Sequence, residues 1–130
     1  MAVKNLRQTV TFKSAPKEVY EALVDPEVHE LVTGDSAELD PRVGGRFRHY
    51  GGSLEGVVVD LEKDRRIVLA WRSTGWPKGH YSIAQFLLAK VAGGTRLTFE
   101  QFGIPAGDFA DIADGWKTYY WAPLKHYLEG

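Results

Sequence analysis

Residues 103–128 read GIPAGDFADIADGWKTYYWAPLKHYL, and this stretch decides the fold. After Gly107 the apolar residues recur at helical spacing, which predicts a helix to the end of the chain with Asp108 as its capping residue. Pro123 predicts a kink or a looser last turn, because proline has no N–H to donate to the carbonyl of Tyr119. The stripe contains Phe109, Ile112, Ala113, Trp116, Tyr119, Tyr120, Leu124, Tyr127 and Leu128. A stripe this aromatic requires another layer to cover it.

The aromatic residues of this helix cannot all point in one direction. Trp116 and Tyr120 are four residues apart and share one face. Trp121 is turned from Tyr120 by about 100°, so we expect it to be exposed. Beside Lys117 and Lys125, an exposed tryptophan would form the edge of a protein–protein contact.

Upstream of the helix, residues 35–102 consist of short β-type runs separated by turn residues. We place strands near 36–40, 45–50, 54–61, 66–73, 80–90 and 95–102. Consecutive strands with short connections predict an antiparallel meander, in which Gly93-Gly94 marks the clearest hairpin. Gly44-Gly45 permits the sharp or left-handed backbone needed to enter the following strand.

The N-terminal part predicts one strand and two short helices. Residues 6–13 alternate between apolar and polar, as in a half-buried strand. Ser14 can cap the first helix, and Asp25-Pro26 separates it from a second that ends at Gly34. In the second helix Val28, Leu31 and Val32 can face inward. The element order predicts an α+β domain whose curved sheet packs against the last helix, leaving a gap suited to a ligand.

Composition limits the class of protein. A chain of 130 residues corresponds to one domain, residues 1–130, and the absence of cysteine excludes disulfides and thiolate metal sites. A formal net charge of −1 gives no general attraction to nucleic acid. No apolar run approaches the roughly 18 residues of a membrane span, and no signal peptide is evident, so we expect a cytoplasmic protein.

Several short motifs follow one another at characteristic spacing. They are Ser-Ala-Pro-Lys-Glu-Val-Tyr at 14–20, Val-Gly-Gly-Arg-Phe at 43–47, Gly-Ser-Leu-Glu-Gly at 52–56, Ile-Val-Leu-Ala-Trp-Arg at 67–72, Trp-Pro-Lys-Gly-His-Tyr at 76–81, Gly-Ile-Pro at 103–105 and Gly-Trp-Lys-Thr-Tyr-Tyr-Trp at 115–121. Together they resemble the START-like, helix-grip (SRPBCC, Bet v 1-like) superfamily, and within it the C-terminal-domain family of the activator of heat shock protein 90 ATPase (AHSA). The resemblance implies a curved antiparallel sheet around a long C-terminal helix, with two short helices after the first strand. It also implies an association with chaperones and the stress response.

The resemblance covers only the C-terminal half of the eukaryotic activators. Those proteins carry an additional N-terminal domain that contacts the chaperone, preceded by a segment rich in asparagine and tryptophan that acts on the ATPase. Here residues 1–5 run directly into the first predicted strand. We therefore expect this chain to lack both parts.

The polar residues on inward positions offer little for catalysis. His49 shares a face with Phe47, and it is either a buried histidine that donates to a backbone carbonyl or a polar group that contacts a ligand. His80 and Ser82 point inward, and Gln101 follows Phe99 on the inner face while Glu100 faces solvent. No inward carboxylate is evident, so we assign no catalytic residue.

Metal and cofactor sites are not predicted. The four histidines, His29, His49, His80 and His126, form no metal-binding spacing. His29 is expected on a solvated helix face, and His126 in the last turn as a cation favoured by the helix C-terminus.

The leading hypothesis is a non-enzymatic domain that binds a small apolar or amphipathic molecule between the sheet and the C-terminal helix. Its predicted lining is Phe47, His49, Trp71, His80, Phe99, Gln101, Trp116 and Tyr120. One alternative is a protein-interaction module related to heat shock protein 90 co-chaperones, with a chaperone as partner. A second alternative is an enzyme of the cyclase or hydrolase type. An exposed edge strand and Trp121 make a homodimer an option beside a monomer.

Overall fold

The computed structural model describes residues 2–130. Met1, the first of the five residues that precede the predicted first strand, lies outside the described residues. The chain forms an α+β domain, as predicted. Its elements are β1 (Val3–Phe12), α1 (Pro16–Val24), α2 (Pro26–Thr33), β2 (Glu38–Leu39), β3 (Arg46–His49), the 3₁₀ turn η1 (Tyr50–Gly52), β4 (Leu54–Glu62), β5 (Arg66–Ser73), β6 (Ser82–Val91), β7 (Gly94–Pro105), the 3₁₀ turn η2 (Ala106–Asp108), α3 (Phe109–Trp116), the π-helical segment η3 (Lys117–Trp121) and α4 (Ala122–Glu129).

One antiparallel sheet connects all strands of residues 2–130 in the order β1-β7-β6-β5-β4-β3-β2. Strands β2 to β7 form the predicted meander, and β1 joins its far edge by pairing with β7. The hairpin between β6 and β7 is confirmed, with Gly93 at a left-handed φ of 81°. The strand predicted over 36–40 is wrong in extent, because only Glu38 and Leu39 pair with β3.

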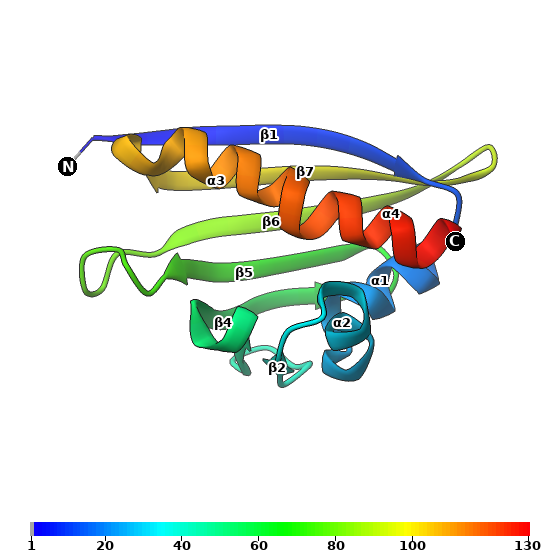
Figure 1. The fold of residues 1–130 in the computed structure, drawn as a ribbon, viewed down its shortest axis with the longest axis horizontal. Helices are drawn as coiled ribbons and strands as arrows, with labels where there is room; N and C mark the ends of the chain where they lie inside the picture. The colour runs from blue at the N-terminus through cyan, green and yellow to red at the C-terminus, as the bar shows by residue number, and fades with distance from the viewer. Residues whose placement is uncertain (1) are drawn as a thin grey trace.

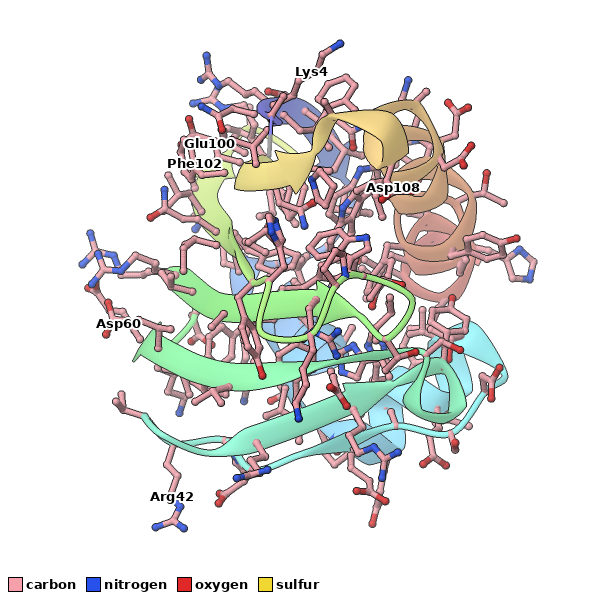
Figure 2. All side chains as sticks on the ribbon, turned by 90° about the vertical axis from the view of Figure 1, so that its left-hand side faces the viewer. Lys4, Arg42, Asp60, Glu100, Phe102 and Asp108 are labelled. Carbon is pink, nitrogen blue, oxygen red and sulfur yellow. The ribbon has the colours of Figure 1, made fainter. Side chains whose placement is uncertain are left out.

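The C-terminal helix lies across one face of the sheet, and α1 and α2 cover the end near the C-terminus (Figure 1). Side chains alternate across the sheet, so Phe99 and Gln101 are buried beneath the helix. Glu100 and Phe102 of the same strand point to the opposite face (Figure 2). The sheet and helix therefore enclose one core between them.

Glycine is required where strands β3 to β5 approach most closely. A Cβ atom on Gly56 would lie 1.8 Å from the carbonyl oxygen of Ala70 and 2.7 Å from the Phe47 ring. The Phe47 ring thus covers Gly56, next to Trp71 on β5. The left-handed backbone predicted at Gly44-Gly45 is confirmed at Gly44, where φ is 85°.

The two short helices have the predicted boundary but differ in detail. Asp25 caps α2 by accepting from the backbone N–H of Glu27, and Gly34 ends the helix in a left-handed conformation. Ser14 does not cap α1, and the prediction was wrong because its hydroxyl donates to the carbonyl of Leu128 at 3.2 Å. Leu31 was expected to face inward but is 70% exposed, because α2 turns His29 toward the core instead.

The C-terminal helix is interrupted before Pro123. Residues 117–121 form a π-helical turn, so the looser turn predicted from Pro123 lies on its N-terminal side. The carbonyl of Tyr119, to which Pro123 has no N–H to donate, accepts a hydrogen bond from the Tyr50 hydroxyl. Asp108 precedes α3, but its side chain makes no capping hydrogen bond, so that prediction was wrong.

The predicted exposure of Trp121 is also wrong. Trp121 is 6% exposed, because the wider π turn brings residues five apart onto one side. Its ring stacks with Trp116 at a centroid distance of 5.5 Å, and its Nε1–H donates to Gln8 on β1. Trp116 and Tyr120 share the inner face as predicted.

Candidate functional site

A hollow of about 310 Å³ opens between the C-terminal helix and the sheet. Its walls are formed by η1, the start of β4, the end of β5, α3 and η3. The lining residues are Tyr50, Ser53, Leu54, Trp71, Asp111, Ile112, Gly115, Trp116, Tyr119 and Tyr120. Most of these side chains are aromatic or aliphatic, and the volume lies at the lower end of the usual range for small-molecule pockets, about 300–1,000 Å³.

Gly115 leaves space for the hollow from the helix side. A Cβ atom there would have the Tyr119 ring at 3.9 Å as its nearest neighbour, so the position faces open space. Glycine inside a helix costs roughly 0.5–1 kcal/mol relative to alanine. The sequence carried this signal, a glycine between two apolar helical residues, but the prediction from aromatic positions missed it.

Tyr50 forms one edge of the hollow and connects the sheet to the helix. Its hydroxyl donates to the Tyr119 carbonyl, and its ring lies edge-on to Tyr119 and Tyr120. Partial burial and the nearby Asp35 carboxylate raise the pKa of Tyr50 to about 12, so the hydroxyl stays protonated and able to donate. Its backbone is left-handed, with φ of 51°, which is uncommon for a residue other than glycine.

Two buried histidines stack behind the hollow. The rings of His29 and His49 lie 4.0 Å apart between centroids and 22° from parallel. His29 was expected on a solvated face but is 1% exposed, because its Nδ1 lies 3.0 Å from the carbonyl of Ala22. Burial lowers the pKa of His29, and burial together with the charge of His29 lowers the pKa of His49 well below its ordinary value. Both rings are therefore neutral near pH 7.

Two predictions were made for His49, a buried histidine that donates to a backbone carbonyl or a polar group that contacts a ligand. It is buried, but its Nδ1 lies 3.1 Å from the hydroxyl of Tyr120 and not at a backbone carbonyl. Burial also raises the pKa of Tyr120 well above its ordinary value, so this phenol remains protonated. Contact of His49 with a ligand stays a prediction.

A chain of hydrogen bonds runs through the core beside these rings. The Trp116 indole donates to Gln101 Oε1 at 2.8 Å, and Gln101 Nε2 donates to the Ser82 hydroxyl at 2.8 Å. Ser82 in turn donates to the carbonyl of Trp71 at 2.9 Å. Each polar atom of the predicted buried amide of Gln101 thus has one partner, and the amide connects the last helix to the sheet.

The structure brings together part of the predicted lining. Trp71, Trp116 and Tyr120 line the hollow, and His49 lies with them around a smaller cavity behind it. Phe47 and Phe99 pack in the core, and His80 Nε2 lies 2.8 Å from the carbonyl of Gly103. The remaining predicted residue, Gln101, belongs to the hydrogen-bond chain. All eight stay predictions as ligand contacts.

Asp111 was not predicted at this site. It is exposed at the edge of the hollow, one residue before Ile112 on α3.

Within residues 2–130 no group of three or more histidine, aspartate or glutamate side chains is placed to hold a metal ion. In the same part of the chain no helix is long and apolar enough to cross a membrane.

Comparison with known proteins gives the family. Residues 13–129 match the family described as Activator of Hsp90 ATPase homolog 1-like protein. The human protein named Activator of 90 kDa heat shock protein ATPase homolog 1 is 32% identical over 115 residues, which cover 88% of this chain and 34% of the human protein. The chain thus spans about a third of the length of the curated relatives it matches.

Solved structures have the same fold at low sequence identity. The crystal structure of an HSP90 activator from Plasmodium falciparum superposes with a TM-score of 0.91 at 23% identity, covering 98% of this chain and 97% of that one. The solution structure of the Aha1 dimer from Colwellia psychrerythraea gives a TM-score of 0.79 at 20% identity, covering 97% and 96%. The helix-grip architecture and the family match together show that this chain belongs to the Activator of Hsp90 ATPase homolog 1-like family.

Proposed function

We propose that this chain is a single, non-catalytic domain that acts in the cytoplasm and binds a small apolar or amphipathic molecule in the hollow between sheet and helix. The observation that carries the proposal is the hollow itself, about 310 Å³ and lined mainly by Tyr50, Leu54, Trp71, Ile112 and Trp116. Large apolar side chains that border an open space favour an apolar occupant.

The test is to search for a bound molecule and then to block its site. Native mass spectrometry of freshly purified protein should show a ligand-bound species, and ligand-observed NMR should show saturation transfer to apolar probes. Gly115→Leu should abolish both signals, because a side chain at Gly115 grows into the hollow. Gly107→Leu is the matched control, since a Cβ atom there meets nothing within 4 Å and Gly107 does not line the hollow. Equal binding by wild type and the folded Gly115→Leu variant would overturn the proposal.

A second candidate is a module that binds a chaperone, and it is favoured by the family and by one surface. Tyr119 and Tyr127, eight residues apart on the helix, are 56% and 43% exposed, with Lys117 and Lys125 also exposed. Exposed tyrosines are typical of protein–protein contacts. Because Trp121 is buried, we propose these tyrosines in its place as the contact surface.

ATP turnover of the host's 90 kDa heat shock protein, measured with and without this chain, tests the second candidate. Tyr119→Ser and Tyr127→Ser should reduce any stimulation and any binding measured by calorimetry. Phe102→Ser on the opposite face, where Phe102 is 41% exposed, is the control. No change in turnover together with no binding would exclude this function.

We also propose that the chain forms either a monomer or a homodimer in solution, as a relative from Colwellia psychrerythraea forms a dimer. Light scattering coupled to size-exclusion chromatography, over a range of protein concentrations, distinguishes the two states.

A further inference from the structure

Among the described residues, three buried ring nitrogens near the hollow have no hydrogen-bond partner, and two of them border the same small cavity, whereas the third, His29 Nε2, does not. In the part of the chain that the structure describes, Trp71 Nε1 and His49 Nε2 are buried and make no hydrogen bond. The two residues are 2% and 3% exposed. Buried polar groups in folded proteins are nearly always hydrogen-bonded, so an unpartnered pair in one place requires an explanation.

Both groups are hydrogen-bond donors. The indole Nε1 of Trp71 always carries a proton. The Tyr120 hydroxyl and His49 Nδ1 lie 3.1 Å apart, and either group can donate. We assign the donated proton to the phenol, because the opposite tautomer would leave both the phenol proton and the Nε2 lone pair without a partner. A neutral imidazole that accepts at Nδ1 carries its own proton on Nε2. His49 therefore presents a second donor without an acceptor.

The two side chains border one small cavity of about 10 Å³. This volume is close to that needed for one water-sized atom. The other lining residues are Leu23, Leu39, Ile67, Leu69, Phe86, Trp116 and Tyr120. Trp71, Trp116 and Tyr120 also line the hollow, so the small cavity adjoins it.

We propose that the ligand of the hollow is an apolar molecule with one uncharged oxygen acceptor, a ketone, ester or alcohol. Its oxygen occupies the small cavity and accepts hydrogen bonds from Trp71 and His49, which together form the polar subsite. A carbonyl oxygen has two lone pairs and so matches two donors. Among the described residues that line the two spaces there is no lysine or arginine, so a carboxylate would be buried without a counter-charge. This inference rests on the proposed ligand-binding function.

The experiment compares two probes of the same shape. Methyl hexyl ketone carries the oxygen, and its hydrocarbon isostere has a methylidene group in place of that oxygen. Neither probe contains an aromatic ring, so neither adds a ring-current shift of its own. Affinities are measured by NMR titration, and the indole Nε1–H signal of Trp71, assigned with Trp71→Phe, is followed for the downfield shift that hydrogen bonding causes.

The ketone is expected to shift the Trp71 indole proton downfield, and the hydrocarbon is not. The ratio of ketone to hydrocarbon affinity should fall by about threefold to tenfold in Trp71→Phe, which corresponds to one hydrogen bond. His49→Asn, which keeps an acceptor for the Tyr120 hydroxyl but removes Nε2, should lower the same ratio. Trp121→Phe, the same change at a residue that lines neither space, should leave it unchanged.

The outcomes separate this inference from the proposed function. If neither probe binds, the ligand-binding function itself fails. If both probes bind but the indole signal stays in place and the ratio is the same in every variant, the hollow binds ligands and the polar subsite is wrong. A water molecule that keeps its nuclear Overhauser effect to the Trp71 indole in the presence of the ketone also overturns the subsite.

Discussion

Buried polar side chains show how far single residues could be predicted. Gln101 was expected inside because it continues the alternation of Phe99, and the structure gives it two partners, Trp116 and Ser82. His29 was missed because a histidine beside Glu30 on a short helix has the same local pattern whether it faces solvent or core. Its burial depends on the ring of His49, which is twenty residues away in the chain and stacks against it.

Gln101→Leu is expected to lower the free energy of unfolding by about 1–3 kcal/mol, because the buried Trp116 indole loses its acceptor. Urea denaturation followed by tryptophan fluorescence measures the change. Gln85→Leu is the control on the outer face, where Gln85 donates to Glu100 and is only partly buried, and its effect should stay within about 0.5 kcal/mol. Equal effects at both positions would contradict the role given to Gln101.

The histidine pair is expected to make the fold sensitive to acid. The pKa values of His29 and His49 are lowered in the folded state from the ordinary value of 6.5. Below that pH the unfolded chain therefore binds more protons than the folded chain. The free energy of unfolding decreases as the pH is lowered, by at most about 1.4 kcal/mol per pH unit for each histidine. The contribution is fully present above about pH 7.

Thermal unfolding measured from pH 7.5 down to pH 5 checks this pH dependence. His29→Asn, whose amide can still donate to the Ala22 carbonyl, should flatten the curve, and so should His49→Asn. His126→Asn in the exposed last turn should keep the wild-type slope. A slope that persists in the double variant of His29 and His49 would show that other groups are responsible.

At the scale of elements, the C-terminal helix is the one whose interior geometry matters for the site. Pro123 removes the donor for the Tyr119 carbonyl, and the π turn before it moves Trp121 into the core while Tyr119 faces out. The same helix carries Gly115 over the hollow. The helix therefore combines a tightly packed C-terminal part with an N-terminal part that leaves space.

Gly115→Ala is expected to raise the free energy of unfolding by about 0.5–1 kcal/mol, because alanine favours the helix and its Cβ meets no close atom. Gly56→Ala is the contrasting substitution, since its Cβ would overlap the Ala70 carbonyl, and it should destabilise the fold strongly. Urea denaturation of both variants measures the effect. A destabilised Gly115→Ala variant would mean that the hollow is not open space.

At the scale of the whole molecule, the N-terminal segment pairs with and contacts the C-terminal part of the chain. Strand β1 pairs along β7, with Val3 opposite Pro105 and Phe12 opposite Thr95. Ser14 donates to the carbonyl of Leu128, and the backbone N–H of Lys13 donates to Glu129. The N-terminal corner is therefore fixed by segments that are far away in sequence.

Folding is expected to be slow for a chain of this size, on the millisecond-to-second scale, because non-local strand pairing must form first. Stopped-flow refolding followed by tryptophan fluorescence measures the rate. Val10→Ala on β1, a partly buried position that pairs with Leu97, tests whether this strand docks late: it should mainly speed unfolding. Refolding within microseconds would contradict the dependence on long-range pairing.

The sequence by itself determined the strand and helix order, the meander and the inner face of most strands, because alternation and helical spacing are local properties of the chain. The motifs around Trp71 and at 115–121 also determined the family. Only the tertiary structure decided the stacking of His29 on His49, the burial of Trp121 and the place of the hollow. Each of these depends on how a helix is rotated against a sheet formed by distant residues, and the spacing of apolar residues along the helix does not determine that rotation.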